Sequence, residues 1–536
     1  MDLTQEVKAW IADDPDPKTA AQLQQWLDSN NEVELRASFS GFLQFGTAGL
    51  RGPIRPGPSG MNRAVVGRTA AGLAAYMKER NLTSVVIGRD ARYGSEDFTF
   101  ETAQIMSGAG MKVYVLPRPL PTPVLAFATN ELKCDVGIMV TASHNPPQDN
   151  GYKVYLGGTV DGIHYRGSQI VSPTDESIAQ KINSITSLAS HPRGKDWTTL
   201  GEEVVHKYVE ITAALATRPG NLKIVYTAMH GVGTETLQRV FHKAGFPQPI
   251  LVDSQAKPDP DFPTVVFPNP EEPGAIDLAL ETARAFDADL VIANDPDADR
   301  CAAAVKDPIK GWRMLRGDEL GVIFGETIAR ATTKGILANS IVSSSLLSKI
   351  AAHYKLDYKE TLTGFKWLAK IDGLTFGYEE ALGYAVDAIT VNDKDGISAA
   401  IKLAQIATDL AAQNKTLLDL LDEVWARHGF HATEQIAIRL TDLSQVGVIM
   451  GNLRHNSPKE IAGRTVTSID DLAKPKDGLP PTDGLRIWLD GGIRIIIRPS
   501  GTEAKMKCYI EAIAKDSATA QTVLDQLRTP LKELLS

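Results

Sequence analysis

The chain of 536 residues is 43% hydrophobic and 23% charged, which are ordinary proportions for a folded globular protein. At roughly 150 residues per domain, this length predicts three or four domains. The net charge of -9 and the pI near 5.7 argue against nucleic acid or an anionic membrane as a main partner. An anionic small molecule remains compatible with them, because basic residues can gather in one cleft.

Cysteine usage and the amino terminus indicate the compartment. Cys134, Cys301 and Cys508 lie far apart, and neither a disulfide framework nor a zinc-binding spacing is visible. This pattern is typical of a reducing environment, so we expect a cytoplasmic protein. The first residues lack the apolar core of a signal peptide, and no stretch is long and apolar enough to span a bilayer. We therefore expect no membrane association.

The first part of the chain predicts an α/β domain. Residues 1 to about 40 are expected to be helical, with an intermittent apolar stripe, and a glycine-rich loop follows at 45–52. Helices and apolar strands then alternate: helices at 63–80 and 95–109, and strands at 84–88, 112–116 and 136–140. This alternation is the α/β pattern.

The same plan recurs twice, and the tail differs. A second round has strands at 222–226, 248–252 and 290–293; a third has a helix at 318–331 and strands at 340–344, 358–361 and 373–378. From about 431 the chain shows period-two alternation at 436–439 and 493–497 and closes with a helix at 516–535. That tail predicts a smaller α+β unit with an antiparallel sheet. We expect four domains, at 1–200, 201–312, 313–430 and 431–536.

Three alternating acids follow the apolar run 290–293: Asp295, Asp297 and Asp299. In an extended backbone, residues two apart face the same way, so three carboxylates would converge, at a high cost in repulsion unless a cation lies between them. Oxygen ligands without Cys or His favour Mg2+ over Ca2+ or Zn2+. A calcium EF-hand loop would need Gly and Glu where Arg300 and Lys306 stand. An acidic surface loop is the alternative.

Ser143 stands where the strand 136–140 ends in a short polar loop, next to His144. A serine beside a histidine can be an activated nucleophile, but the Gly-x-Ser-x-Gly elbow of a hydrolase is missing. Adjacent residues at a turn also seldom face each other. The alternative is a serine that caps a turn.

Other stretches carry groups that suit a phosphorylated sugar. Arg498-Pro499-Ser500-Gly501-Thr502 combines an arginine, two hydroxyls and a glycine, which suit a phosphate dianion. The loop 45–52 joins glycines to Arg51, and Glu379 and Glu380 end a predicted strand, where acids could accept hydrogen bonds from sugar hydroxyls. Lys153 and Lys394 lie in further polar loops. Taken singly, each stretch is equally compatible with a turn, a solvated loop or a surface charge.

Together and in chain order, these motifs resemble those of the α-D-phosphohexomutase family, whose members move phosphate between carbons 1 and 6 of a sugar. Thr141 to Pro146 is similar to the family's phosphoserine loop and Asp295 to Arg300 to its magnesium loop. Glu379 and Glu380 fall in its sugar-binding loop, Arg498 to Thr502 in its distal phosphate loop, and Arg51 in its amino-terminal loop. The resemblance covers nearly the whole chain. It implies three related α/β domains and one smaller α+β domain, arranged in a heart shape around a central cleft.

The resemblance also implies the roles of the residues. Ser143 would carry a phosphoryl group and, with Asp295, Asp297 and Asp299, bind one Mg2+ per chain. Catalysis would involve Ser143, His144, Lys153 and Arg51, with Lys153, near His144, handling the proton of the attacking hydroxyl. The substrate would be bound by Arg300, Glu379, Glu380, Lys394, Arg498, Ser500, Gly501 and Thr502. A sugar 1,6-bisphosphate would be the intermediate and activator, and the protein would be a monomer or a homodimer.

One departure concerns the substrate. Many hexomutases have Glu-x-Ser in the sugar-binding loop, whereas Ala381 stands at the third place here, as in the branch with phosphopentomutases and glucose-1,6-bisphosphate synthases. We expect a phosphoglucomutase that also acts on mannose phosphates. The alternatives are a phosphopentomutase or bisphosphate synthase with the same machinery, a phosphatase that uses a metal-bound water, and a non-enzymatic phosphosugar-binding protein.

Overall fold

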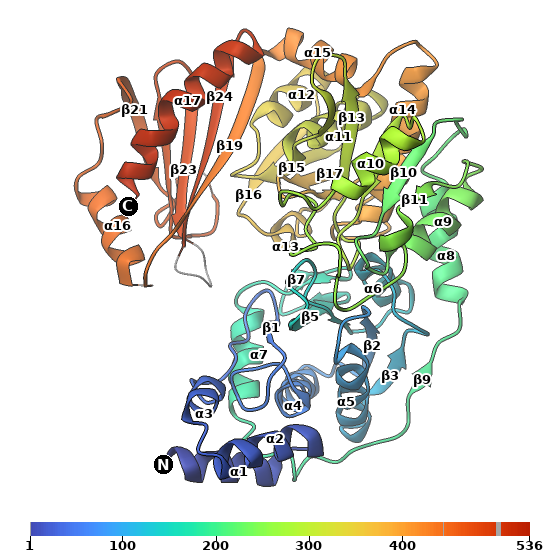
Figure 1. The fold of residues 1–536 in the computed structure, drawn as a ribbon, viewed down its shortest axis with the longest axis vertical. Helices are drawn as coiled ribbons and strands as arrows, with labels where there is room; N and C mark the ends of the chain where they lie inside the picture. Colours follow the sequence, from blue (N-terminus) through green and yellow to red (C-terminus); the bar gives the residue numbers. More distant parts are fainter. Residues whose placement is uncertain (1, 443, 477, 500–504, 536) are drawn as a thin grey trace. The chain divides into compact units, whose positions relative to one another are not determined.

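The computed structural model describes residues 2–442, 444–476, 478–499 and 505–535 (Figure 1). The chain forms two compact units. The first comprises Met1–Leu315, Ala369–Thr375 and Gly383–Ala412, and the second comprises Arg316–Leu368, Phe376–Leu382 and Gln413–Ser536.

The amino-terminal segment forms three helices rather than one continuous helical stretch. They are α1 (Leu3–Asp13), α2 (Pro17–Asp28) and α3 (Glu32–Ser38). Pro15 drives the preceding Asp14 out of the helical region, to φ -71° and ψ 118°. A second break follows at Asn30, whose φ is +51°. The prediction for residues 1–40 was therefore right in type and wrong in continuity.

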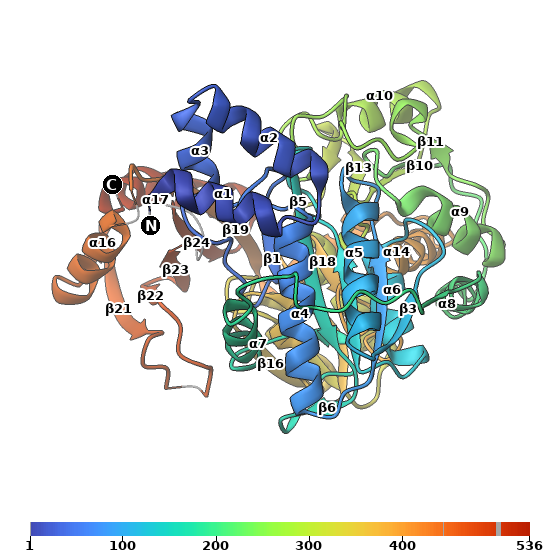
Figure 2. The same cartoon turned by 90° about the horizontal axis from the view of Figure 1, so that it is seen from below.

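The first sheet of the first unit has the strand order β1-β5-β4-β2-β3-β9, and β8 also pairs with β5. Its strands are β1 (Leu50–Pro53), β2 (Ser84–Arg89), β3 (Lys112–Val115), β4 (Val136–Val140), β5 (Asp149–Leu156), β8 (Ser168–Gln169) and β9 (Thr198–Thr199). Its neighbouring helices are α4 (Arg63–Glu79), α5 (Ser95–Gly108), α6 (Thr122–Glu131) and α7 (Thr174–Asn183). Figure 2 shows α4 and α5 side by side. A separate hairpin pairs β6 (Thr159–Val160) with β7 (Ile163–His164). The predicted strands and helices of this region are confirmed.

The second sheet has the order β11-β10-β12-β13-β14. Its strands are β10 (Ile224–Thr227), β11 (Ile250–Leu251), β12 (Leu290–Ala293), β13 (Ala302–Asp307) and β14 (Gly311–Met314), and its helices are α8 (Glu203–Ala213), α9 (Gly233–Lys243) and α10 (Asp277–Ala285). The first unit also holds β18 (Gly383–Ala385) and α14 (Gly396–Ala411). β12 is buried throughout and pairs in parallel with β10. The expected strand at 248–252 is shorter, and the β13–β14 hairpin was not foreseen.

The second unit begins with helix α11 (Gly317–Ala331). Its parallel pair is β15 (Ile336–Ser340) and β16 (Asp357–Thr361), and β17 (Leu374–Glu379), which belongs to this unit from Phe376 on, follows along the chain. Further helices are α12 (Leu346–Tyr354), α13 (Phe365–Leu368) and α15 (Leu417–His428). The expected strand at 340–344 was misplaced, because β15 ends at Ser340 and the next residues form a turn. The serines of that turn bond to side chains rather than to a ladder.

The tail of the chain forms an antiparallel sheet in the order β19-β24-β23-β22-β21-β20. Its strands are β19 (Phe430–Arg439), β20 (Glu460–Ile461), β21 (Arg464–Asp471), β22 (Leu485–Leu489), β23 (Ile493–Pro499) and β24 (Lys505–Ala514), with helices α16 (Ser444–His455) and α17 (Ser517–Leu534). Ile487, Ile495 and Cys508 lie in its core. The antiparallel α+β prediction is confirmed.

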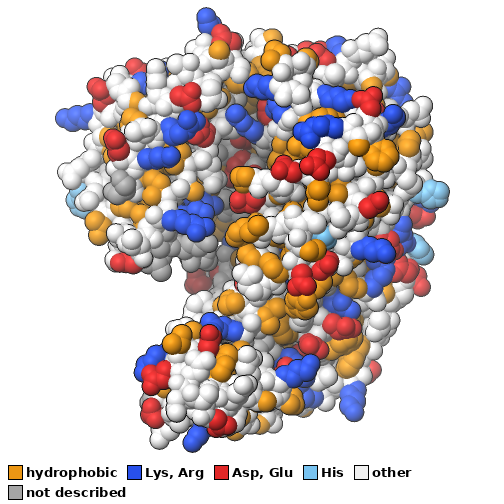
Figure 3. Space-filling model, in the orientation of Figure 1, with side chains coloured by type: hydrophobic (Ala, Val, Ile, Leu, Met, Phe, Trp, Pro, Cys, Tyr) orange, Lys and Arg blue, Asp and Glu red, His pale blue; other side chains and the backbone are white. Residues whose placement is uncertain are grey.

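The charged side chains on the surface and the apolar character of the helices can be compared with the composition of the sequence. Acidic and basic side chains are interspersed on the face drawn in Figure 3. Among the described residues, no helix has the length and apolar character needed to cross a bilayer.

Candidate active site

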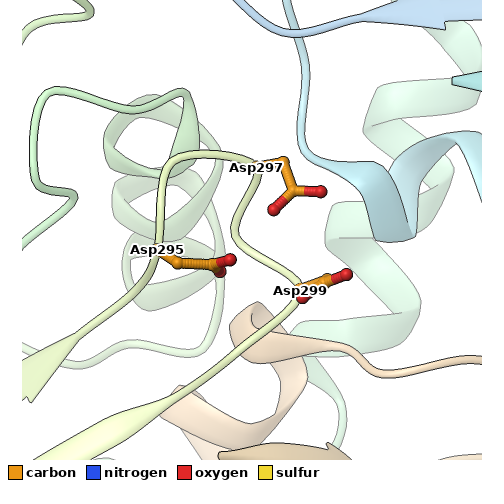
Figure 4. A group of neighbouring side chains, drawn as sticks. All are labelled: Asp295, Asp297 and Asp299. Atoms are coloured by element: carbon orange, nitrogen blue, oxygen red, sulfur yellow. The ribbon is translucent and has the colours of Figure 1, made fainter. Parts of the chain in front are cut away.

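The three acids predicted to converge do so (Figure 4). One possible ligand oxygen from each of Asp295, Asp297 and Asp299 lies within 4.8 Å of the others, and all three residues are fully buried. The reason expected from the sequence was wrong. The backbone is not extended here; Ala298 has φ +53° and donates its N–H to the carbonyl of Asp295 at 2.8 Å. A tight turn after β12, rather than strand alternation, points the carboxylates at one spot.

Three separate segments of the first unit hold this turn by its carbonyl groups. The N–H of Thr122 bonds to Asp297 O at 2.9 Å, that of Val232 to Pro296 O at 2.8 Å, and that of Gly396 to Ala298 O at 3.2 Å. A Cβ atom at Gly231 would lie 2.3 Å from the Cα of Pro296, and one at Gly396 would lie 2.2 Å from the Arg300 carbonyl. The close backbone approach therefore requires glycine at both positions.

Two lysines partly compensate the charge of the acids. The Nζ atom of Lys153 donates to Oδ2 of Asp297 at 2.7 Å and to Oδ2 of Asp299 at 3.0 Å. Lys394 Nζ lies 3.2 Å from Asp299 Oδ2, and Thr122 donates its hydroxyl to Asp297 Oδ2 at 2.7 Å. The Oδ1 atoms of Asp297 and Asp299 are buried without a hydrogen-bond partner. Because such atoms are costly, these residues fit a divalent cation that takes oxygen ligands.

Protonation gives the same indication. Burial, reinforced by the charges of Asp297 and Asp299, raises the pKa of Asp295 to about 8. Burial would also raise the pKa of Asp297, but the ammonium of Lys153 outweighs it and lowers that pKa. The carboxylates of Asp297 and Asp299 in turn hold the pKa of Lys153 above its usual value, against the effect of burial. The raised pKa of Asp295 reflects carboxylate repulsion that the two lysines do not fully offset and that a divalent cation would relieve.

Ser143 lies directly at this cluster. Its Oγ donates to Oδ2 of Asp295 at 2.8 Å, although the two residues are 152 positions apart. Its backbone has φ +52°, and its side chain is buried. The Nδ1 atom of His144 lies 3.3 Å from the same Oγ, so these neighbours do face each other, contrary to the expectation for a turn. The predicted serine and the predicted acids therefore form one site.

The remaining predicted residues of the first unit surround this centre. Arg51 donates to the Asn145 side chain at 3.1 Å, within the serine loop. The N–H of Arg300 donates to Oδ1 of Asp295 at 3.0 Å, and its guanidinium lies 3.7 Å from Glu271. Burial, with the charges of Arg300 and Arg51, holds the pKa of His144 well below its usual value. Two guanidinium groups thus make the surroundings of Ser143 attractive to an anion.

Arg92 was missed by the sequence reasoning. Its guanidinium donates to four carbonyls of the serine loop: Ser143 and Asn145 at 2.6 Å, Pro146 at 2.8 Å and Asp149 at 3.1 Å. It also stacks over the ring of Phe262, 4.8 Å from the centroid, and pairs with Asp90 at 3.4 Å. The only sequence signal is that Arg92 follows the end of a strand, which does not distinguish it from other arginines in loops.

The acids of the predicted sugar-binding loop belong to the second unit. Glu379 is buried and accepts the N–H of Gly364 at 2.6 Å. Glu380 is half-buried, and its Oε2 accepts the hydroxyls of Ser340 at 3.1 Å and Ser343 at 2.9 Å. These serines fall in the stretch that had been expected to be a strand, so their role was not foreseen.

The predicted distal phosphate loop is described only in part. Arg498 lies near the end of β23, and its charge partly offsets the effect of burial, which raises the pKa of Tyr509 in β24. Ser500, Gly501 and Thr502 lie outside the described residues. Ser143, the acids, Arg51, Lys153, Arg300 and Lys394 belong to the first unit, and Glu379, Glu380 and Arg498 belong to the second. That both groups serve one substrate stays a prediction.

Four domain models of one family match the chain in order. They are phosphoglucomutase/phosphomannomutase alpha/beta/alpha domains I, II and III at residues 43–189, 203–311 and 316–428, and the C-terminal domain at 446–529. The four-domain α/β architecture is thereby confirmed. The domain limits expected from the sequence stay predictions, and α1 to α3 precede the first match.

Curated relatives resemble the chain over most of its length. A "Probable phosphomannomutase" of Haemophilus influenzae is 48% identical, over 89% of this chain and 98% of its own. The human "Phosphopentomutase" is 33% identical, over 100% of this chain and 95% of its own. A "Phosphoglucomutase" of Staphylococcus haemolyticus is 33% identical, over 90% and 92%.

Solved structures share the fold. The open form of the exocytosis-sensitive phosphoprotein pp63/parafusin of Paramecium has a TM-score of 0.71 at 18% identity, covering 93% of this chain and 95% of its own. A phosphoglucomutase/phosphomannomutase family protein of Burkholderia thailandensis has a TM-score of 0.70 at 21% identity, covering 90% and 96%.

Proposed function

Because the chain belongs to the phosphoglucomutase/phosphomannomutase family of α-D-phosphohexomutases and is a mutase of the isomerase class, we propose that it interconverts glucose 1-phosphate and glucose 6-phosphate, and that it also acts on mannose phosphates. The observation that carries the proposal is the 2.8 Å hydrogen bond from Ser143 Oγ to an acid of the buried triad. It supports a serine that carries phosphate beside a cation site.

In this mechanism, Ser143 Oγ alternates between an alcohol and a phosphate ester. A sugar hydroxyl attacks the phosphorus, the bond from phosphorus to Ser143 Oγ breaks, and the sugar leaves as a 1,6-bisphosphate that returns its other phosphate. Arg51 and Arg300 offset charge on the phosphoryl oxygens, which matters because the transition state of such a transfer is loose and highly charged. Lys153, the residue expected from the sequence to handle the proton of the attacking hydroxyl, is held as an ammonium by Asp297 and Asp299 and cannot accept it. The neutral imidazole of His144, whose Nδ1 lies 3.3 Å from Ser143 Oγ, is the proposed acceptor.

One Mg2+ per chain would be held by Asp295, Asp297, Asp299 and phosphorylated Ser143, and when bound it supplies Lewis-acid polarisation of the phosphate ester. The buried oxygens of Asp297 and Asp299 that lack a hydrogen-bond partner support this assignment. Arg300, Lys394, Glu379, Glu380 and Arg498 are proposed substrate contacts, together with Ser500, Gly501 and Thr502.

A second candidate is a phosphopentomutase or sugar-bisphosphate synthase. Two observations favour it: Ala381 lacks the hydroxyl of the Glu-x-Ser loop, and the relatives that match nearly the whole chain include a human "Phosphopentomutase" and a human "Glucose 1,6-bisphosphate synthase". The cytoplasmic location and the monomeric or homodimeric state remain predictions.

Steady-state kinetics would test the proposal. With glucose 1,6-bisphosphate as primer, we expect glucose 1-phosphate to have a higher kcat/KM than ribose 1-phosphate, and Ser143→Ala to abolish turnover. A preference for ribose 1-phosphate would move the assignment to the second candidate. Release of inorganic phosphate without a primer would indicate a phosphatase, and full turnover by Ser143→Ala would reject the phosphoserine mechanism.

A further inference from the structure

Two serine hydroxyls from one turn meet a single carboxylate oxygen of the sugar-binding loop. Ser340 and Ser343 both donate to Glu380 Oε2, and the N–H of Glu380 donates back to Ser343 Oγ at 3.0 Å. The two hydroxyls are themselves 2.9 Å apart. Ser340 and Ser343 are buried, while Glu380 is half-buried. Both the backbone and the side chain of Glu380 are therefore held by the same turn.

The turn that carries these serines is itself held in place by two residues of the antiparallel sheet in the same unit. Arg494 of β23 donates to the carbonyl of Ile341 at 3.0 Å and to that of Ser343. Glu511 of β24 accepts the hydroxyl of Ser344 at 2.7 Å and the N–H of Ser345 at 2.8 Å. The guanidinium of Arg494 thus holds the first part of the turn, and the carboxylate of Glu511 holds the two residues that follow it.

Arg494 and Glu511 also hold each other. Their side chains are 3.0 Å apart, each with about 3% exposure, and His431 lies 3.0 Å from Glu511. Arg494 reaches Glu360 of β16 at 3.3 Å as well. A buried ion pair is weak evidence for stability because of its desolvation cost, but it fixes geometry when every partner is in place. The arrangement therefore fixes the position of the turn, apart from any contribution it makes to stability.

We infer that Ser343, assisted by Ser340, is the positioning residue for Glu380, and that Arg494 and Glu511 set the turn which presents the two hydroxyls. The inference rests on the proposed function, in which Glu380 grips a sugar hydroxyl. A carboxylate can accept about four hydrogen bonds, so acceptor capacity remains for the sugar after the serines have bound. Ala381 offers no hydroxyl in this loop, and the turn supplies the orienting hydroxyls from another part of the same unit.

Ser343→Ala is the main test, made in the full-length protein. We expect KM for glucose 1-phosphate to rise about ten- to a hundredfold, as for the loss of a hydrogen bond to a charged group, with kcat changed less than about threefold. Ser343→Thr, which keeps the hydroxyl, should restore KM. The rate of phosphoserine hydrolysis in water should not change, because the chemistry at Ser143 is intact.

Ser348→Ala is the matched control. Its hydroxyl donates to the Ser345 carbonyl at 2.7 Å, so it removes a serine bond next to the turn without touching Glu380. We expect its KM to equal that of the wild type. An equal rise of KM in both variants would show a general loosening of the segment and would overturn the inference.

A double-mutant cycle tests whether the effect passes through Glu380. In a Glu380→Gln background, Ser343→Ala should raise KM by less than about twofold if the two act as one unit. Glu511→Gln should raise KM in the wild-type background, and a normal KM in that variant, at a temperature where it is folded, would remove Glu511 from the device. Additive effects of Ser343 and Glu380 would also contradict the inference.

The failure of the inference and that of the proposed function give different results. If calorimetry detects no binding of glucose 1-phosphate, mannose 1-phosphate or ribose 1-phosphate to the wild-type protein, both are wrong. If the wild type binds and turns over a sugar phosphate while Ser343→Ala keeps its KM, the proposed function stands and only the positioning role is rejected.

Discussion

Each acid of the triad has its own partners, and these decide what its removal does. Asp297 accepts bonds from both Lys153 and Thr122, and its other oxygen is buried without a partner. We predict that Asp297→Asn lowers the affinity for Mg2+ at least about tenfold, because the amide keeps the shape but loses the charge. Isothermal titration with Mg2+ would measure the change.

Asp289, which directly precedes the first residue of β12, provides the control for that experiment. Its carboxylate accepts only a surface N–H, from Lys223 at 2.8 Å, among the bonds that the structure describes for it. Asp289→Asn should leave the Mg2+ affinity unchanged. Equal affinities in the wild type and both variants would remove Asp297 from the cation site.

Glu380 gives a prediction about pH. Burial and the charges of Glu379 and Asp318 raise the pKa of Glu380 to about 7, and Tyr509 also faces it. The carboxylate, which accepts sugar hydroxyls, forms as the pH rises through that value. We therefore predict that KM for the sugar phosphate falls between about pH 6 and pH 8, and that Glu380→Gln removes this dependence. The substrate's own titration is common to both proteins, so a parallel pH profile in the variant would contradict the prediction.

At this scale, the sequence could reveal residues that stand together along the chain. Asp295, Asp297 and Asp299 form a motif, and Ser143 follows a strand end, so both were found. The contacts that give Arg92 and Ser343 their roles are with segments dozens of positions away, and no motif along the chain marks them. Even the correct triad was reached by wrong geometry, since a turn replaces the expected strand.

The loop after β4 is the element on which the serine chemistry depends, and one arginine holds it. Arg92 donates to four carbonyls between Ser143 and Asp149. Lysine cannot reproduce this planar fork, so we predict that Arg92→Lys lowers kcat about ten- to a hundredfold with little change in KM, because the loop loses its fixed position. Steady-state kinetics and the phosphorylated fraction of Ser143 would report the effect.

Arg89→Lys serves as the comparison. Arg89 ends β2 and pairs with the exposed Glu96 at 3.2 Å, an interaction that contributes little. The Arg89→Lys variant should have the kinetics of the wild type. If Arg92→Lys has the same kcat as Arg89→Lys, the serine loop is held by its other contacts.

Elements were predictable where periodicity and length agreed. The helices from α4 to α5 and the buried strands β2 and β4 have clear patterns, and they were placed within a residue or two. The segment 340–344 has apolar residues between serines and was mistaken for a strand. Its backbone is instead fixed by Arg494 and Glu511, which no period can reveal.

At the scale of the whole molecule, each unit contains a buried cluster of charged residues. The cluster of the second unit, around Arg494 and Glu511, affects the free energy of unfolding. Burial would raise the pKa of Glu511, but Arg494, His431 and Ser344 outweigh it and lower the pKa to about 2. A lowered carboxyl pKa stabilises the fold above the unfolded value, near pH 4.5, and this contribution is lost as the pH falls towards 2.

We therefore predict that Glu511→Gln destabilises the protein by roughly 3–5 kcal/mol at neutral pH, because it leaves Arg494 buried with its main counter-ion removed. The difference from the wild type should shrink below about pH 4.5. Urea unfolding at several pH values would measure it. Glu434→Gln in the same sheet is the control, since Glu434 pairs with the partly exposed Arg528 and should lose less than about 1 kcal/mol. Equal losses would mean that burial of the Arg494 pair adds nothing.

The turn that carries the acids has a consequence for protein engineering. Its carbonyls are bonded by Thr122, Val232 and Gly396, and its tight approach leaves no space for a side chain at Gly231. The conformation of the hexapeptide from Asp295 to Arg300 therefore depends on other parts of the chain. Grafted alone onto another scaffold, it would lack the hydrogen bonds that fix its conformation. A functional graft would have to include all three supporting segments.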